Sequence, residues 1–148
     1  MPIRCEIVSQ DRTVFEGDVD NVVLPGTEGE MGVLPHHSPL LTTLKYGVIK
    51  VRRQGKEQIF AVSGGVAEVQ PDIVTVLADA AEDVAEIDIR RAEAAKKRAE
   101  EALAQTERGN VEQILAIEAA LRRSNLRIEV AQRYRSRSDR APRPQGEE

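Results

Sequence analysis

The hydrophobic pattern of the chain changes its repeat at about residue 86. Before this point, short runs rich in β-branched side chains alternate with breaks that contain Gly or Pro, as in TVFEGDV and DIVTVLA. After it, the stretch EIDIRRAEAAKKRAEEAL has neither Gly nor Pro, and Ala92, Ala95, Ala99 and Leu103 recur every three or four residues. Because each repeat suits only one kind of secondary structure, the chain is expected to form strands first and helices second.

The first part of the chain predicts an antiparallel sandwich or barrel. One β-hairpin is expected to turn at Gln54-Gly55, and another at Gln70-Pro71-Asp72. Short strands at this spacing favour an antiparallel architecture over alternating strand-helix-strand units. Aromatic residues make up only 3% of the chain and Trp is absent, so the core must consist of Val, Ile, Leu and Ala.

The second part predicts two helices between about residues 87 and 134. Asp88 can cap the first helix or stabilise its start by charge. Gly109-Asn110 suggests the C-cap of the first helix followed by the N-cap of the second, and so short a turn implies an antiparallel pair. Because alanine buries little area, the first helix should pack weakly, and the helical part should be the more mobile one.

The predicted fold class is therefore α+β, with an antiparallel β-sandwich followed by an antiparallel two-helix hairpin. We assign the sandwich to residues 1–84, the hairpin to residues 85–136 and a disordered tail to residues 137–148. The tail is polar and contains Pro, which is typical of a solvated chain end, although its arginines could contact an acidic partner.

Composition limits the functions that the chain can have. A net charge of -4 argues against general nucleic-acid binding. A single cysteine, Cys5, leaves no partner for an internal disulfide and is best interpreted as a packed thiol. The beginning of the sequence lacks an apolar run like that of a signal peptide, and no window approaches the ~18 apolar residues that a membrane helix needs. A soluble protein is expected.

His36-His37 is the only histidine pair, and it raises the question of a metal site. Zinc needs three or four ligands. Neighbouring ligands are absent here, apart from Glu28 and Glu30, which are distant in the sequence. A loop with structural or interface histidines is the better interpretation. Because no nucleophile elbow, Walker loop or zinc signature is present, we predict no catalytic residues and no metal.

Four arginines of the predicted hairpin share a spacing that suggests one surface. Arg91 and Arg98 are seven residues apart, and Arg123 and Arg127 are four apart, so each pair lies on one helix face. Folding the chain near residues 109–110 would place the two pairs at neighbouring heights. Gathered arginines suit phosphate oxygens well. The alternative is a solvated face whose arginines pair with nearby glutamates, and the spacing alone favours this alternative.

Three stretches together resemble the epsilon subunit of bacterial and chloroplast F-type ATP synthases: VVLPGTEGEMGVLPHHSPLLTTLKYG, VSGGVAEVQPDIVTVLAD and EIDIRRAEAAKKRAEEAL. The similarity extends from Met1 to about Tyr134 in the order and spacing of that family. It implies an N-terminal β-sandwich and a C-terminal helical hairpin, in agreement with the division derived from periodicity.

The resemblance also implies a non-catalytic place in the central stalk of a rotary enzyme. The sandwich would bind the gamma subunit and the ring of c subunits, and so couple proton flow to ATP synthesis on the catalytic subunits. Glu30 and His37 are the expected contacts with the c ring. The expected location is the cytoplasmic side of the bacterial plasma membrane, in preference to the thylakoid, with membrane association only through the complex.

In this family the hairpin can lie folded on the sandwich or extend along gamma toward the alpha and beta subunits, and the extended form inhibits ATP hydrolysis. Some bacterial members stabilise the folded form by binding ATP through the motif Ile/Leu-Asp-x-x-Arg-Ala. The resemblance therefore implies ATP as a regulatory ligand, with no required cofactor. It implies the following ATP-binding set: Glu82, Ile87, Asp88, Arg91, Ala92, Arg98, Arg123 and Arg127.

Three other interpretations compete with this one. The first is a binding module with a helical extension and no link to a rotary enzyme. The second is a metal hydrolase that uses His36 and His37. The third is a nucleic-acid binder that uses the Arg-rich tail, which conflicts with the acidic net charge and the lack of interleaved aromatic residues.

Overall fold

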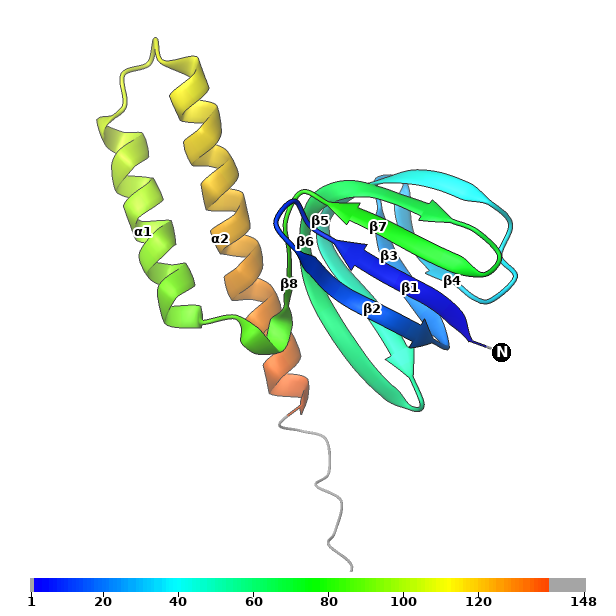
Figure 1. Ribbon diagram of the computed structural model, residues 1–148. Coiled ribbons are helices and arrows are strands. Elements are labelled where there is room, and N and C mark those ends of the chain that lie inside the picture. The colour runs from blue at the N-terminus through cyan, green and yellow to red at the C-terminus, as the bar shows by residue number, and fades with distance from the viewer. Residues whose placement is uncertain (1, 139–148) are drawn as a thin grey trace, which may run out of the picture. The chain divides into compact units, whose positions relative to one another are not determined.

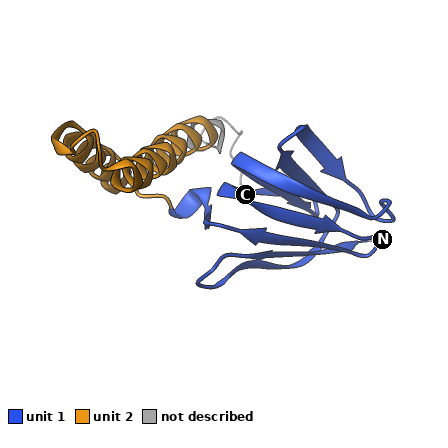
Figure 2. Cartoon of the chain, turned by 90° about the horizontal axis from the view of Figure 1, so that it is seen from above, with its two compact units in different colours: residues 1–86 blue, residues 87–148 orange. Residues whose placement is uncertain are grey.

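The computed structural model describes residues 2–138, with side chains as far as Tyr134. It divides into two compact units, one that ends at Glu86 and one that begins at Ile87 (Figure 2). The first unit contains all the strands and the second contains both long helices (Figure 1). The predicted α+β class, with strands before helices, is therefore confirmed.

The first unit consists of eight strands and one short 3-10 helix, η1 (Val84–Glu86). The strands are β1 (Ile3–Val8), β2 (Thr13–Val19), β3 (Asn21–Gly26), β4 (Gly29–Val33), β5 (Leu40–Arg53), β6 (Lys56–Val69), β7 (Ile73–Ala78) and β8 (Ala81–Asp83). Hydrogen bonding connects them in the order β2-β1-β7-β6-β5-β3-β4, and β8 pairs with β6. All pairs are antiparallel except β1 and β7, which are parallel.

Both predicted β-hairpins are present. Gln54 and Gly55 have φ angles of 51° and 76°, and two positive values in succession match the right-handed twist of the flanking strands. The second turn is closed by a bond from the Gln70 amide to the Ile73 carbonyl, at 2.9 Å.

The long strand β6 changes partners in the middle, at Gly64-Gly65. Beyond this point it pairs with β7, and before it with β8. Gly65 has a φ of 135°, and a Cβ atom there would lie 2.3 Å from the Leu77 carbonyl oxygen. Only glycine allows this close approach, which lets β6 run through both layers of the sandwich (Figure 1).

The core of the sandwich follows the alternation of the strands. In β1, Ile3, Cys5 and Ile7 are fully buried, while the residues between them are partly exposed. Phe60 is the largest buried side chain, and its ring lies 5.5 Å from that of Phe15. Burial raises the pKa of the Cys5 thiol to about 12, as expected for the packed thiol that the sequence suggested.

The second unit is an antiparallel pair of helices, α1 (Ile89–Gln105) and α2 (Val111–Ser138), as predicted (Figure 1). Asn110 caps α2, since its side-chain oxygen accepts the Gln113 amide at 3.3 Å. The prediction that Gly109 ends the first helix was wrong. The helix ends earlier because the Thr106 amide bonds the Leu103 carbonyl, and the Thr106 hydroxyl bonds the Ala102 carbonyl.

Two residues of the predicted disordered tail are helical instead. Residues 137 and 138 belong to α2, because the helical hydrogen bonding continues through them. Residues 139–148, which hold the rest of the predicted tail, lie outside the described residues.

Candidate functional site

The start of α1 is defined by the acidic residue of the predicted nucleotide motif. Asp88 has an extended backbone conformation, and its Oδ1 atom accepts the Arg91 amide at 3.2 Å. The Asp88 carbonyl accepts the Ala92 amide at 3.0 Å. Asp88 is therefore the N-cap of α1, and the favourable interaction of its charge with the helix dipole adds to this role.

Among the described side chains of α1 and α2, all the buried ones except Val130 are Ala or Ser. Ala92 and Ala99 are the buried residues of α1, seven positions apart. In α2, Ser124 and Ala131 are buried with the same spacing. An antiparallel pair can bring both sets to matching heights, Ala92 with Ala131 and Ala99 with Ser124. The two helices thus approach along small side chains.

The four arginines all lie on the same flank of this small-residue stripe. Each residue of a helix is turned by about 100° from the one before it. Arg91 and Arg98 each precede a buried alanine by one position, and Arg123 precedes Ser124 by one. Arg127 follows Ser124 by three positions, which is a rotation of about 300°. It therefore lies about 60° from Ser124, on the same flank as the residue that precedes Ser124.

In an antiparallel pair, residues that precede the facing positions emerge on one side of the pair in both helices, because reversing the chain direction also reverses the sense of rotation. The structure therefore brings Arg91, Arg98, Arg123 and Arg127 to a single surface, which we call the arginine face. The first three are exposed and Arg127 is partly buried. Glu93 and Glu100 follow the buried alanines by one position, so they project on the opposite flank.

The remaining residues of the implied ATP set have other positions. Glu82 belongs to β8, where it is paired with Ala61 in the sandwich. Ile87 and Ala92 are buried, so their side chains pack within the protein. The arginine face and Asp88 are consequently the part of the implied set that the hairpin alone brings together.

The two predicted c-ring contacts lie along and beyond β4. Glu30 is exposed in β4, opposite Pro25. His37 lies in the following loop, where its Nδ1 atom is 2.7 Å from the Ser38 carbonyl. The preceding residue, His36, has a φ of 67° and donates its amide to the Pro71 carbonyl at 2.8 Å, which ties this loop to the β6–β7 turn.

Residues 2–138 contain neither a candidate metal site nor a helix that could span a membrane. This part of the chain contains no group of three or more His, Cys, Asp or Glu side chains able to hold a metal ion. Neither of its helices has the length and apolar character needed to cross a bilayer.

An exposed apolar surface on the sandwich was missed in the sequence. Strand pairing aligns Val8 with Leu77, Leu77 with Val66, and Val66 with Thr43. Leu77 is 59% exposed, and Leu41 on β5 is 69% exposed. We call Val8, Leu41, Val66 and Leu77 the apolar row. Its signal in the sequence was leucine at an outward strand position between buried Val76 and Ala78, where a polar residue is usual.

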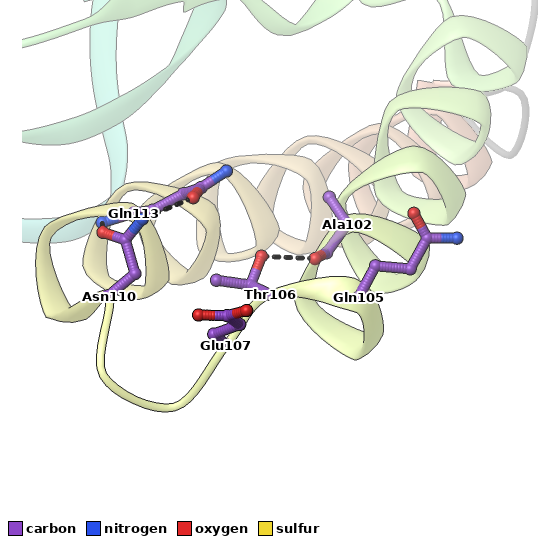
Figure 3. Close-up of a pocket in the computed structure, with 6 residues that line it drawn as sticks. All are labelled: Ala102, Gln105, Thr106, Glu107, Asn110 and Gln113. Carbon is purple, nitrogen blue, oxygen red and sulfur yellow. Dashed lines mark hydrogen bonds between the residues drawn. The ribbon is translucent and has the colours of Figure 1, made fainter.

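A cavity of about 370 Å³ lies at the tip of the hairpin, away from the arginines in sequence (Figure 3). Two of its polar side chains are bonded to each other, Asn110 Nδ2 to Gln113 Oε1 at 2.8 Å, and the Thr106 hydroxyl bonds the Ala102 carbonyl. It offers no cation for a phosphate, because its lining is Ala102, Gln105, Thr106, Glu107, Asn110 and Gln113. This cavity does not extend the arginine face.

Comparison with protein families matches both units. Residues 2–84 match the family described as "ATP synthase, Delta/Epsilon chain, beta-sandwich domain". Residues 85–132 match "ATP synthase, Delta/Epsilon chain, long alpha-helix domain". The two matches together span most of the chain.

Individual relatives agree with the family match. The ATP synthase epsilon chain of Dehalococcoides mccartyi is 49% identical over 135 residues, covering 90% of this chain and 94% of the relative. That of Herpetosiphon aurantiacus is 44% identical over 137 residues, covering 93% and 99%.

Solved structures show the same fold. A chain of the Euglena gracilis mitochondrial ATP synthase (OSCP/F1/c-ring) has a TM-score of 0.71 and 25% identity, with 88% of this chain and 81% of that chain covered. A chain of the Tetrahymena thermophila mitochondrial ATP synthase central stalk/c-ring has a TM-score of 0.56 and 14% identity, with 88% and 97% covered, and supports the fold alone. The chain belongs to the ATP synthase delta/epsilon chain family, as an epsilon chain.

Proposed function

We propose that this chain is a non-catalytic subunit of the central stalk of a rotary, proton-translocating ATP synthase. In this role the sandwich transmits rotation between the membrane ring and the catalytic subunits, and the helical hairpin regulates ATP hydrolysis. The relatives at 44–49% identity are named epsilon chains, which supports the assignment. Their bacterial origin supports a peripheral position on the cytoplasmic side of the plasma membrane.

Two surfaces of the sandwich suit the two stalk partners. The apolar row provides exposed hydrophobic area of the kind that marks protein interfaces, and we assign it to the gamma subunit. Glu30 and His37 lie on β4 and the loop after it, and we assign them to the c ring. Both sets of residues belong to the sandwich, and we assign regulation to the hairpin.

The arginine face carries the regulatory part of the proposal. Four guanidinium groups on one surface repel one another unless carboxylates or an anion lie between them, and their planar forks suit phosphate oxygens. ATP bound there would stabilise the closed hairpin, in which α1 packs on α2. The gain follows RT ln(1 + [L]/Kd), about 2.7 kcal/mol at a hundredfold excess over Kd. When ATP falls, the hairpin would open and reach the alpha and beta subunits.

Calorimetric titration of the full chain with ATP tests this proposal. We expect saturable binding that weakens at least tenfold in Arg91→Ala, because a charge-assisted hydrogen bond contributes about 1.5–3 kcal/mol. The matched control is Arg90→Ala, which removes the same charge from the neighbouring position outside the arginine face. Absence of binding at millimolar ATP, or equal affinities for the two variants, would contradict it.

A further inference from the structure

The chain leaves the sandwich through a short segment that is bonded along β6. This segment, which we call the strap, consists of β8 and η1, residues 81–86. Its strand pairs Ala81 with Val62, Glu82 with Ala61, and Asp83 with Phe60. Just before it, the Ser63 amide donates to the Ala80 carbonyl at 2.9 Å. Three paired residues at a sheet edge form a weak strand by themselves, so other bonds must decide whether the strap stays in place.

Asp83 supplies two such bonds, one with each of its carboxylate oxygens. Oδ2 accepts Nε2 of Gln58 at 2.8 Å, which ties the strap to the side chains of β6. Oδ1 accepts the Ala85 amide at 2.9 Å, which caps the 3-10 turn that follows. Val84, between these two bonds, is only 4% exposed. One side chain thus joins the strand, the turn and the neighbouring strand β6.

We propose that Asp83 is a positioning residue that keeps the strap on β6 while the hairpin moves, so that movement begins only after Glu86. The proposal rests on the mobile hairpin of the proposed function. A detached strap would add six residues to the tether, each spanning about 3.3 Å, and so extend the reach of α1 by about 20 Å. A longer, looser tether would lower the effective concentration of the hairpin at any surface that it must find.

Amide-resolved hydrogen exchange of the full chain tests the strap directly. In the unmodified chain, we expect the amides of residues 83–86, which follow Glu82 of the implied ATP set, to exchange at the same rate with and without saturating ATP. Under the proposed function, amides within α1 and α2 should become more protected when ATP is added. Loss of protection at residues 83–86 when ATP is withdrawn would overturn the proposal. If ATP changes nothing in α1 or α2, the proposed regulation fails, and the variants below still decide the role of Asp83.

Three variants separate the bonds of Asp83 from its charge. Asp83→Ala should speed exchange of the Ala85 amide at least tenfold, because that amide loses its acceptor. Asp83→Asn should restore protection, since its carbonyl can accept the Ala85 amide and its NH₂ can donate to a flipped Gln58. Gln58→Ala, which removes one bond only, should have an intermediate effect and covers the case in which Asp83→Ala fails to fold.

Glu57→Ala is the matched control for these variants. It removes a carboxylate one position from Gln58 and breaks the exposed ion pair with Arg52, without touching the strap. Exchange at Ala85 should remain as in the unmodified chain. An equal effect of Glu57→Ala and Asp83→Ala, or no effect of Asp83→Ala, would overturn the assignment of Asp83.

Discussion

The Asp88 carboxylate accepts the backbone amide of Arg91 at 3.2 Å, so the acid and the arginine of the nucleotide motif share the first turn of α1. The acid therefore has a structural role whether or not a ligand is bound. A substitution at Asp88 that removes this oxygen changes the start of the helix as well as the charge beside the arginine face.

Exchanging Asp88 for alanine or asparagine distinguishes these two roles. Asp88→Ala removes the N-cap and should destabilise the helical unit by about 1 kcal/mol, whereas Asp88→Asn keeps a capping oxygen and should change stability much less. Thermal unfolding followed by circular dichroism measures this difference. If ATP contacts the carboxylate, both variants should lose affinity in calorimetry. Normal affinity in Asp88→Asn together with weak binding in Asp88→Ala would assign Asp88 to capping alone.

Gly65 should not tolerate a side chain. Its φ is 135°, and a Cβ atom added there would approach the Leu77 carbonyl oxygen to 2.3 Å. Gly65→Ala should therefore destabilise the sandwich by at least about 2 kcal/mol. Gly32→Ala is the control, because a Cβ atom there meets nothing within 4 Å. Denaturant unfolding of both variants measures the difference, and similar midpoints would show that β6 can adjust its bend.

Cys5 should make stability depend on pH in the alkaline range. Burial raises the pKa of its thiol from 9.0 to about 12, so in this interval the unfolded chain binds fewer protons than the folded chain. The contribution is fully present below pH 9 and is lost as the pH rises to about 12, at up to about 1.4 kcal/mol per pH unit.

The measurement is the free energy of unfolding at several pH values, in the natural chain and in Cys5→Ala. The variant should be less stable near neutral pH because it leaves a small cavity, but its decline above pH 9 should be shallower, so the two curves should converge as the pH rises. Parallel curves for the two proteins would assign the alkaline decline to other groups.

Leu77 and Leu115 provide a matched test of the apolar row. Each is 59% exposed, one on the sandwich and the other on the hairpin, so replacing either with serine should leave stability nearly unchanged. Leu77→Ser should weaken reassembly with a stalk complex depleted of this subunit by about tenfold, since it removes apolar area from the interface. Leu115→Ser should not affect it. The assignment to gamma would fail if Leu77→Ser reassembles with normal affinity.

Local features of the fold were predictable because their causes lie within a few residues of each other. The turn at Gln54-Gly55 needs positive φ angles, which Gly55 adopts readily, and Asp88 caps a helix that begins at the next residue. The prediction for the end of α1 was wrong because Thr106, three residues before Gly109, already caps the helix. Its hydroxyl donates to the Ala102 carbonyl. The parallel pairing of β1 with β7 could not be predicted in this way, because no local turn connects the two strands.

The sequence by itself determined where strands give way to helices and which helix faces carry the arginines, because hydrophobic period and residue spacing act along a single element. The tertiary structure decided what depends on residues far apart in the chain. Strand pairing leaves Leu77 exposed beside Val66 and Val8, and the bond from Gln58 to Asp83 crosses 25 positions of the sequence. The antiparallel reversal of α2 against α1 turns two separate arginine pairs into one surface. Contacts of this kind arise only when the core has formed, because packing brings distant backbone segments into register.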